Sequence, residues 1–239
     1  MRSYGVTDIG RNRNTNQDYI FYSDEPVGML PNLYIVADGM GGHNAGDYAS
    51  SFSVNRFVEL VREREDSHMV LAMREAIEIV NEELFIKGTV EEECKGMGTT
   101  FVAAVMDGNI MYIMNIGDSR LYVVDRELTQ VTMDHSLVEE LIRSGELNRE
   151  EAKDNPIKNV ITRAVGVEKH IIPDFFEVSL HRQEYILLCS DGLTNMVDED
   201  EIMEIIEEEK EAKQIVEKLV ERANFYGGRD NISAIVVKQ

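Results

Sequence analysis

The sequence predicts a single α+β domain that spans residues 1–239. Three observations favour this fold class. Short apolar runs of strand length recur along the whole chain, amphipathic helical patterns occur in one pair near the start and another near the end, and no low-complexity linker divides the chain. Apolar residues make up 43% and charged residues 29%, as is typical of a globular protein. The chain is long enough to bury a substantial core.

The composition argues against several classes of partner. The formal net charge is -21, so the surface should repel the phosphate backbone of nucleic acids and anionic membranes. No apolar run approaches the ~20 residues of a membrane span, and the N-terminus lacks the apolar core of a signal peptide. Cys94 and Cys189 form neither a CxxC motif nor a zinc-ligand spacing. We therefore expect a cytoplasmic monomer with no nucleic-acid or membrane partner.

Two short strands, 4–8 and 19–23, flank a polar loop near the N-terminus. The loop carries two arginines and ends on Asp18. It is either a solvated hairpin loop, or a site that presents an arginine such as Arg13 to an anion and Asp18 to a cation.

The stretch 33–49, LYIVADGMGGHNAGDYA, starts as an apolar strand over 33–37 and reaches Asp38. Glycines follow, and a helical pattern starts near Asp47. A carboxylate fixed at a strand end is a common basis for a metal or phosphate site. The alternative is an ordinary strand–turn–helix corner with Asp38 as a turn residue, and this stretch alone does not decide between the two.

Apolar periodicity predicts amphipathic helices over 47–64 and 67–86, the second with Ser67 as a cap. The pattern then changes to strands. TTFVAAVM and IMYIMNI are joined by Asp107-Gly108-Asn109, which predicts a β-hairpin with an Asp-Gly turn. Asp118 follows in a tight turn before the strand RLYVVDR, and a further strand is expected over 128–133.

Residues 134–166 have less regular patterns and are a candidate lid or flap. They include a short helix ended by Gly145 and a capping pair, Asn148 with Glu151. Strands PDFFEVSL and YILLCSDG follow, and the second ends at Asp191. Two acidic helices come next, and GGRDN leads into the C-terminal strand ISAIVV.

Four aspartates share a setting, since each lies at the end of an apolar strand beside a glycine or a tight turn: Asp38, Asp118, Asp191 and Asp230. Their recurrence indicates that they converge at one rim of a sheet system. Such a cluster is strongly repulsive without cations, and hard divalent cations such as Mg²⁺ or Mn²⁺ prefer oxygen ligands. Carboxylate-bridged metal pairs ~3.5–4 Å apart activate water and neutralise phosphoryl oxygens, so with an arginine the pattern indicates phosphate ester hydrolysis.

Other phosphatase chemistries are excluded by their motifs. Neither cysteine has an arginine six positions later, since Thr100 and Asn195 stand there. The GDSR at 117–120 is not the GDxHG of histidine-ligated metallophosphoesterases, and the DxD at 198–200 opens a helix instead of ending a strand. No GxxxxGK[ST] loop is present.

The motifs taken together resemble the metal-dependent protein serine/threonine phosphatases of the PPM (PP2C) family, in their compact bacterial form. The matching pieces occur in family order and cover nearly the whole chain: TDIGRNRNTNQD, VADGMGGHNAGDYAS, MGTTFVAAV, NIGDSRLYVV, DHSLVEELIRSGEL, NPIKNVITRAVG, LLCSDGLTNMV and GGRDNISAIVV. The resemblance implies an αββα four-layer sandwich, in which two antiparallel β-sheets are flanked by helices, with a flap at about 136–166.

The same resemblance implies two core Mn²⁺ or Mg²⁺ ions and a possible third. Asp38 matches the carboxylate that bridges the core ions, and the Gly39 carbonyl matches a ligand of one of them. Asp191 and Asp230 match ligands of the other core ion. Asp118, together with Asp191, matches the third site.

Two further positions take their roles from the resemblance. Asp18 matches an acidic residue that acts through metal-bound water, and Arg13 matches the arginine that holds the substrate phosphate. A histidine directly after the DG serves as general acid in the eukaryotic branch, but Met40 occupies that position here. His43 is a candidate substitute; it is otherwise a polar loop residue, and metal-bound water can protonate the leaving oxygen instead.

The flap also departs from the family pattern. It has Asp154-Asn155-Pro156 where bacterial relatives often carry His-Pro. This difference bears on flap structure and substrate preference, and leaves the predicted chemistry unchanged.

The function implied is direct hydrolysis of phospho-Ser/Thr residues in proteins by a metal-bridging hydroxide, without a covalent enzyme intermediate. The expected partners are phosphorylated proteins, including a Ser/Thr protein kinase. Two alternatives stay open: a non-catalytic pseudophosphatase that binds phosphoproteins or a kinase, and a phosphatase dedicated to one regulatory protein. Loss of metal ligands would favour the pseudophosphatase, but the four aspartates and Arg13 are all present.

Overall fold

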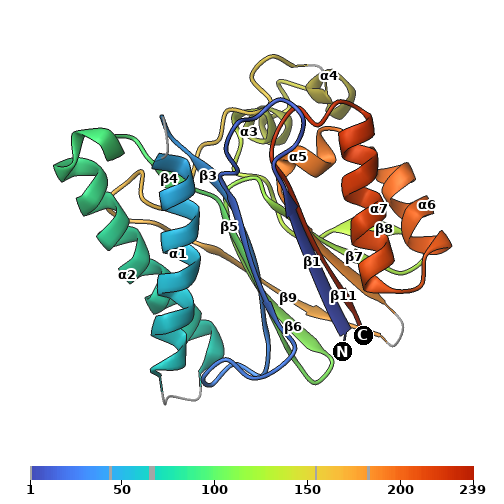
Figure 1. The fold of residues 1–239 in the computed structure, drawn as a ribbon, viewed down its shortest axis with the longest axis horizontal. Helices are drawn as coiled ribbons and strands as arrows, with labels where there is room; N and C mark the ends of the chain where they lie inside the picture. Colours follow the sequence, from blue (N-terminus) through green and yellow to red (C-terminus); the bar gives the residue numbers. More distant parts are fainter. Residues whose placement is uncertain (1, 43–44, 65–67, 154, 182–183) are drawn as a thin grey trace.

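The chain forms four layers in the computed structural model, which describes residues 2–42, 45–64, 68–153, 155–181 and 184–239. Two antiparallel sheets lie face to face (Figure 1). Helices α1 (Ala45–Arg62) and α2 (Met69–Val90) cover one outer face, and α5 (Asp191–Thr194), α6 (Glu199–Glu208) and α7 (Ala212–Phe225) cover the other. This arrangement confirms the predicted αββα sandwich.

The first sheet has the strand order β1-β11-β10-β7-β8. Its members are β1 (Arg2–Asp8), β7 (Arg120–Val124), β8 (Leu128–Gln130), β10 (Tyr185–Cys189) and β11 (Ile232–Lys238). The N-terminal and C-terminal strands therefore pair with each other, and the register runs from Arg2 opposite Lys238 to Asp8 opposite Ile232. This pairing brings the loop after β1 next to the loop before β11.

The second sheet has the order β2-β3-β5-β6-β9, with β4 paired to the end of β3. Its members are β2 (Asp18–Ser23), β3 (Leu33–Met40), β4 (Gly98–Thr99), β5 (Phe101–Asp107), β6 (Ile110–Ile116) and β9 (Asp174–Ser179). A short 3-10 helix, η1 (Glu92–Cys94), precedes β4.

In the described part of the chain, no helix has the length and apolar character needed to cross a bilayer.

The strand alternation explains why the sheets stack. Successive side chains of a strand point to opposite faces. On β3, Tyr34 and Val36 enter the core between the two sheets, whereas Leu33, Ile35 and Ala37 enter the core under α1 and α2. A strand buried on both faces has a continuous apolar run, which is why its sequence shows no polar alternation.

Several boundaries differ from those expected. β3 continues through Asp38 to Met40, because its last two residues pair with β4. The second helix covers Met69–Val90 rather than 67–86, and the cap proposed at Ser67 lies outside the described residues. The strand expected over 128–133 ends at Gln130.

The hairpin turn also lies one residue later than expected. Asp107 still pairs with Ile110, so the two-residue loop is Gly108-Asn109 instead of Asp107-Gly108. Gly108 has a φ of 61°, in the left-handed region that glycine adopts without strain.

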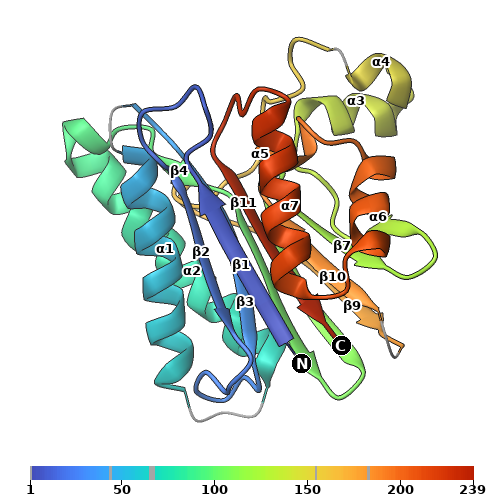
Figure 2. The same cartoon turned by 45° about the vertical axis from the view of Figure 1, so that its right-hand side comes forward.

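The segment that connects β8 to β9 along the chain folds as its capping signals predict. Helix α3 (Leu137–Ser144) begins where the Ser136 side chain accepts a hydrogen bond from the Glu139 amide, and ends at Gly145, whose φ is 79°. Helix α4 (Arg149–Lys153) follows the expected capping pair, in which Asn148 and Glu151 exchange side chain–backbone hydrogen bonds. Figure 2 shows both helices at one end of the sandwich.

The core between the sheets should be sensitive to truncation. Leu188 on β10 is fully buried there, so we expect Leu188→Ala to lower the free energy of unfolding by about 2–5 kcal/mol through lost burial and a residual cavity. The matched control is Leu71→Ala on α2, where the side chain is 45% exposed and the loss should stay below about 1 kcal/mol. Urea unfolding measures both. Equal losses would show that the two sheets do not share a packed core.

Candidate active site

Loops from both sheets meet at the end of the sandwich that carries α3, α4 and α5 (Figure 2). Asp18 is the first residue of β2, and its register partner on β3 is Asp38. Residues directly opposite in an antiparallel pair have Cβ atoms roughly 4.5–5.5 Å apart. Two carboxylates are thus held side by side by the sheet itself.

Asp18 is 4% exposed and bonded across to the other sheet. Its Oδ2 accepts a hydrogen bond of 2.7 Å from the Ser190 hydroxyl, and the Ser233 amide donates to the same hydroxyl at 3.0 Å. Its other carboxylate oxygen, Oδ1, is buried and has no hydrogen-bond partner. A buried acceptor without a partner is costly, which makes this oxygen a candidate contact for a cation or its water.

Asp38 and Gly39 lie near the end of β3, where close contacts hold their backbone in place. The Asp38 amide donates to Thr100 Oγ1 at 2.8 Å, and the Asp38 carbonyl accepts from the Thr100 amide at 2.8 Å. Gly39 is confined, because a Cβ there would lie 2.0 Å from the Gly46 carbonyl oxygen. Only glycine therefore lets the start of α1 approach this strand so closely.

Asp191 and Asp230 come from neighbouring strand ends of the other sheet. Asp191 begins the short helix α5 directly after Ser190, and its Oδ2 accepts from Asn195 Nδ2 at 2.9 Å. Asp230 precedes β11, and its Oδ1 accepts from the Asn231 amide at 2.8 Å. A Cβ at Gly192 would lie 1.9 Å from the Asn231 carbonyl oxygen, so glycine is again required for the close approach.

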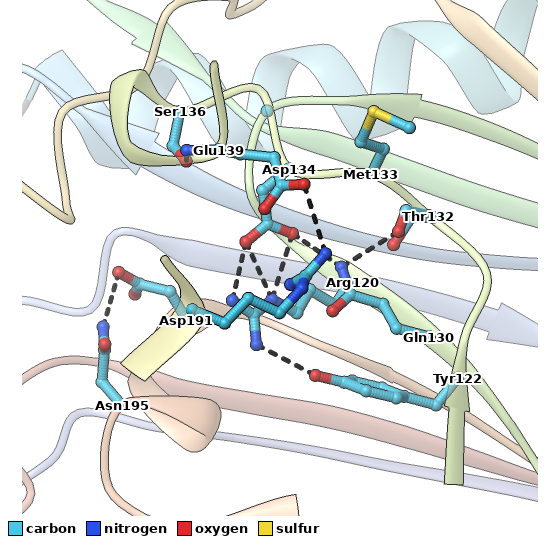
Figure 3. Close-up of polar contacts among 12 residues, drawn as sticks. Arg120, Tyr122, Gln130, Thr132, Met133, Asp134, Ser136, Glu139, Asp191 and Asn195 are labelled. Atoms are coloured by element: carbon cyan, nitrogen blue, oxygen red, sulfur yellow. Dashed lines mark hydrogen bonds and ion pairs between the residues drawn. The ribbon is translucent and has the colours of Figure 1, made fainter. Parts of the chain in front are cut away.

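Asp118 lies in the β6–β7 turn and is 8% exposed. Two residues on, the Arg120 guanidinium forms a bidentate pair with Asp134, with its shortest nitrogen–oxygen distance at 2.7 Å, and donates to the Tyr122 hydroxyl at 3.0 Å. Figure 3 shows this network with the Asp191–Asn195 pair in the same view. The positive charge of Arg120 lowers the pKa of both Asp118 and Asp191 against the larger effect of burial.

Burial and repulsion between carboxylates raise the pKa of Asp18, Asp38, Asp118 and Asp191. Burial, as the largest cause, raises the pKa of Asp18 to about 7, of Asp118 to about 8 and of Asp191 to about 6. It also raises the pKa of Asp38 well above its usual value, with further increases from the charges of Asp18, Asp191, Asp118 and Asp230 in that order. All five carboxylates predicted from sequence are therefore brought within electrostatic range of one another, with Asp38 as the member that interacts with each of the others.

The donor chemistry fits divalent cations. The cluster consists of anionic oxygens, which Mg²⁺ and Mn²⁺ prefer. As placed, however, no three Asp, Glu, His or Cys side chains in the described ranges surround one point closely enough to hold an ion. Protein donors satisfy individual oxygens instead: Ser190 bonds to Asp18, Asn195 bonds to Asp191, and Arg13 bonds to Asp230. The residues that could hold cations are present, and their side chains would have to rotate to bring their oxygens together.

Arg13 extends from the loop between β1 and β2 and contacts the cluster. Its Nη2 lies 2.7 Å from Asp230 Oδ2, and its side chain is 47% exposed. The loop is fixed by Asn231, whose Nδ2 donates to the carbonyls of Ile9 and Thr15, both at 3.0 Å. The loop is therefore anchored beside the carboxylates through its backbone, although residues 11–15 are exposed, and it is not a hairpin loop because β1 and β2 belong to different sheets.

Sequence reasoning missed the residues that support the cluster. His135 was given no role, yet it is buried and its Nδ1 accepts from the Gly117 amide at 3.0 Å, next to Asp118. Its Nε2 lies 3.1 Å from Asp174 Oδ2, and Arg163 contacts both side chains. Ser190 and Thr100 were also overlooked. Their partners are distant in sequence, so no local pattern could have identified them.

Two predicted features bear on proton delivery and the flap. His43 lies outside the described residues, so its general-acid role stays a prediction. Met40 is described, and its side chain lies over Gly98, where an added Cβ would be 2.8 Å from Met40 Cε and 2.7 Å from Val167 Cγ2. Within the segment predicted to be a flap, Ser136 bridges to Ile161 and the Leu137 amide donates to the Val160 carbonyl at 2.8 Å, so residues 136–161 form a closed loop.

Comparisons with known proteins agree with this geometry. The family model for protein phosphatase 2C matches residues 10–235. The serine/threonine phosphatase stp of Listeria monocytogenes is 40% identical over 240 residues, which cover 98% of this chain and 94% of that protein. The solved serine/threonine phosphatase of S. agalactiae has a TM-score of 0.92 and 36% identity, and the match covers 100% of this chain and 99% of that one.

A second solved structure bears on the metal question. The catalytic domain of the serine/threonine protein phosphatase PstP, solved in complex with two manganese ions, has a TM-score of 0.86 and 30% identity to this chain. The match covers 98% of this chain and 96% of that one.

The raised pKa values predict a pH-dependent stability in EDTA. The folded state binds more protons than the unfolded state between the ordinary aspartate pKa near 3.8 and the folded-state pKa of Asp18 at about 7. Stability should therefore fall as the pH rises through this range. Thermal unfolding at pH 5 and pH 8 measures the effect, and Asp18→Asn should flatten it because the amide carries no charge.

The exposed Asp107→Asn on the β5–β6 hairpin is the matched control and should keep the slope of the wild type. A melting temperature that rises from pH 5 to pH 8, or an unchanged slope in Asp18→Asn, would contradict this interpretation of the cluster.

Proposed function

We propose that this chain, which belongs to the protein phosphatase 2C family and is a protein serine/threonine phosphatase, uses Mn²⁺ or Mg²⁺ to hydrolyse phospho-Ser and phospho-Thr residues. The observation that carries the proposal is the convergence of five acidic side chains from both sheets at one end of the sandwich. Such a cluster is stable at neutral pH only when protons or cations compensate its charge.

The family resemblance implies a distinct proposed role for each carboxylate. Asp38 interacts with all the others and is suited to contact two cations at once, with the Gly39 carbonyl beside it. Asp191 and Asp230 would be ligands of one core cation, and Asp118 with Asp191 would be ligands of a third cation. The Oδ1 atom of Asp18, which is buried and has no hydrogen-bond partner, would contact a cation-bound water. When bound, two such cations supply an activated water and neutralise phosphoryl oxygens.

Arg13 is proposed to orient the substrate phosphoryl group. A guanidinium has five N–H donors and grips phosphate in a bidentate manner. Among the described residues, the Arg13 side chain bonds to Asp230 alone and is 47% exposed, so further N–H donors are available to a substrate. Asp230 thus places the guanidinium next to the cluster, where an incoming phosphate would meet it.

Two groups are candidates for the general acid that protonates the leaving oxygen. The thioether of Met40 carries no proton to donate. His43 is retained as a prediction for the general acid, and water within the cluster is the alternative. Neither group is needed for the binding and orientation described above.

The substrates proposed are phosphorylated proteins, among them a Ser/Thr protein kinase. We also propose that residues 1–239 act as one monomeric domain, in which residues 136–166 form a flap beside the site. A non-catalytic pseudophosphatase is not favoured by any observation, since every predicted acidic ligand and Arg13 lie at the site.

Asp38→Asn tests the proposed function. The amide removes the one carboxylate that interacts with all the others, so we expect kcat for a phosphothreonine peptide in Mn²⁺ to fall by roughly 10²–10³-fold. The exposed Asp107→Asn should retain wild-type kcat. Circular dichroism confirms that both variants fold. Turnover of Asp38→Asn close to that of the wild type would show that the assignment is wrong.

A further inference from the structure

The loop after β1 and the loop before β11 form one rim beside the carboxylate cluster. The amides of Arg11 and Asn12 both donate to the Gly228 carbonyl, at 2.7 and 3.2 Å. Asn231 ties the same two loops together through its bonds to Ile9 and Thr15. The backbone of this rim is therefore held next to Arg13 and Asp230.

Three arginines project from this rim: Arg11, Arg13 and Arg229. Arg11 packs its stem against Gly228, where an added Cβ would lie 3.0 Å from Arg11 Cγ. Arg229 follows Gly228 directly, and both Arg11 and Arg229 are exposed. Arg13 contributes its guanidinium at Asp230, 2.7 Å from the carboxylate. We call these three residues the arginine rim.

Two of the three guanidinium groups have no acidic partner. In the ranges that the structure describes, neither Arg11 nor Arg229 forms an ion pair or a side-chain hydrogen bond. In the described ranges other surface cations, such as Arg126 and Arg143, also lack an ion pair, so Arg11 and Arg229 are distinguished by their place beside Arg13 and Asp230. Elsewhere on this surface, Arg56 pairs with Glu59 and Glu83, and Lys218 with Glu208 and Glu209.

Two acidic residues that contact segments flanking the rim are already bonded to other groups. Asp8 Oδ1 accepts from the Gly10 amide at 2.8 Å and from Asn224 Nδ2 at 3.0 Å. Glu201 Oε1 accepts from Arg222 at 3.0 Å and from the Tyr226 hydroxyl at 3.2 Å. The charges of Arg11 and Arg229 are thus left available to a molecule in solution.

From these contacts we propose that Arg11 and Arg229 dock acidic side chains of the phosphoprotein segment that enters the site. This inference rests on the proposed function, because Arg13 is the member of the rim that meets the phosphate. Extended chain spans about 3.3 Å per residue, so the carboxylates recognised lie within about four residues of the phosphorylated one. The net charge of -21 disfavours the approach of acidic segments to the protein as a whole. The arginine rim offers them a positively charged place to bind, and so favours one orientation of the segment.

Two phosphothreonine peptides of one sequence test the proposal, one with glutamates beside the phosphothreonine and one with glutamines. Wild-type protein in Mn²⁺ at low salt should hydrolyse the glutamate peptide with a KM roughly five-fold lower and a similar kcat, because exposed charge pairs contribute modestly. Salt should weaken this preference by screening. The Arg11→Ala/Arg229→Ala variant should lose it while keeping wild-type kinetics on the glutamine peptide.

Arg126→Ala is the matched control, since Arg126 is an exposed arginine on the β7–β8 turn, away from the site, and it should keep the full preference. Equal KM values for the two peptides in the wild type, or a preference that survives in the double variant, would overturn the proposal.

Fluorescence anisotropy separates this inference from the proposed function. The same two peptides, made with a non-hydrolysable phosphonate, report binding without turnover. If neither phosphopeptide is hydrolysed, the proposed function fails, and tighter binding of the glutamate analogue to wild type than to the double variant still supports the rim. If both peptides are hydrolysed and the two analogues bind equally, only the rim is refuted.

Discussion

The mutual repulsion of five acidic side chains at one end of the sandwich is the constraint on which this structure depends. Asp18 and Asp38 face each other in register on neighbouring strands, Asp191 and Asp230 approach from the other sheet, and Asp118 lies in the β6–β7 turn that connects the two sheets. Bringing carboxylates out of water raises the free energy of the folded state unless protons or cations offset their charge. The apolar layers on both faces of the sheets provide the compensating stability.

The sandwich geometry is what makes such a cluster possible. The β1–β11 pairing places the loop with Arg13 beside the loop with Asp230, although these residues are far apart in sequence. Ser190 then links the sheets through its bond to Asp18. Glycines at 39 and 192 remove the Cβ atoms that would prevent the close backbone contacts. Function and fold therefore share the same small residues and the same hydrogen bonds.

Local signals in the sequence identified most of the fold and the acidic residues of the candidate site. Apolar periodicity located the strands and helices, and caps such as Ser136 and Gly145 marked the ends of α3 correctly. The face-to-face sheets followed from family resemblance, whereas the order of the strands was not predicted, because periodicity does not specify which strands pair. Boundaries shifted where pairing over a distance extended an element, as when β4 extends β3 to Met40.

The supporting residues were the part that could not be foreseen. His135, Ser190 and Thr100 contact groups that are distant along the chain, so only the folded arrangement gives them a purpose. The exposed arginines Arg11 and Arg229 look like ordinary surface residues in the sequence. Their significance comes from the absence of acidic partners around them in the described structure, which depends on how Asp8 and Glu201 are bonded.

The central claim is that the buried carboxylates hold protons in the absence of cations and exchange them for divalent cations. Titration calorimetry of EDTA-stripped, dialysed protein with Mn²⁺ near pH 7, in two buffers of different ionisation enthalpy, tests it most directly. The account predicts saturable binding with a heat that differs between the buffers, because Asp18 and Asp118 release protons as Mn²⁺ binds. Absence of saturable binding at millimolar Mn²⁺, or binding with the same heat in both buffers, would contradict it.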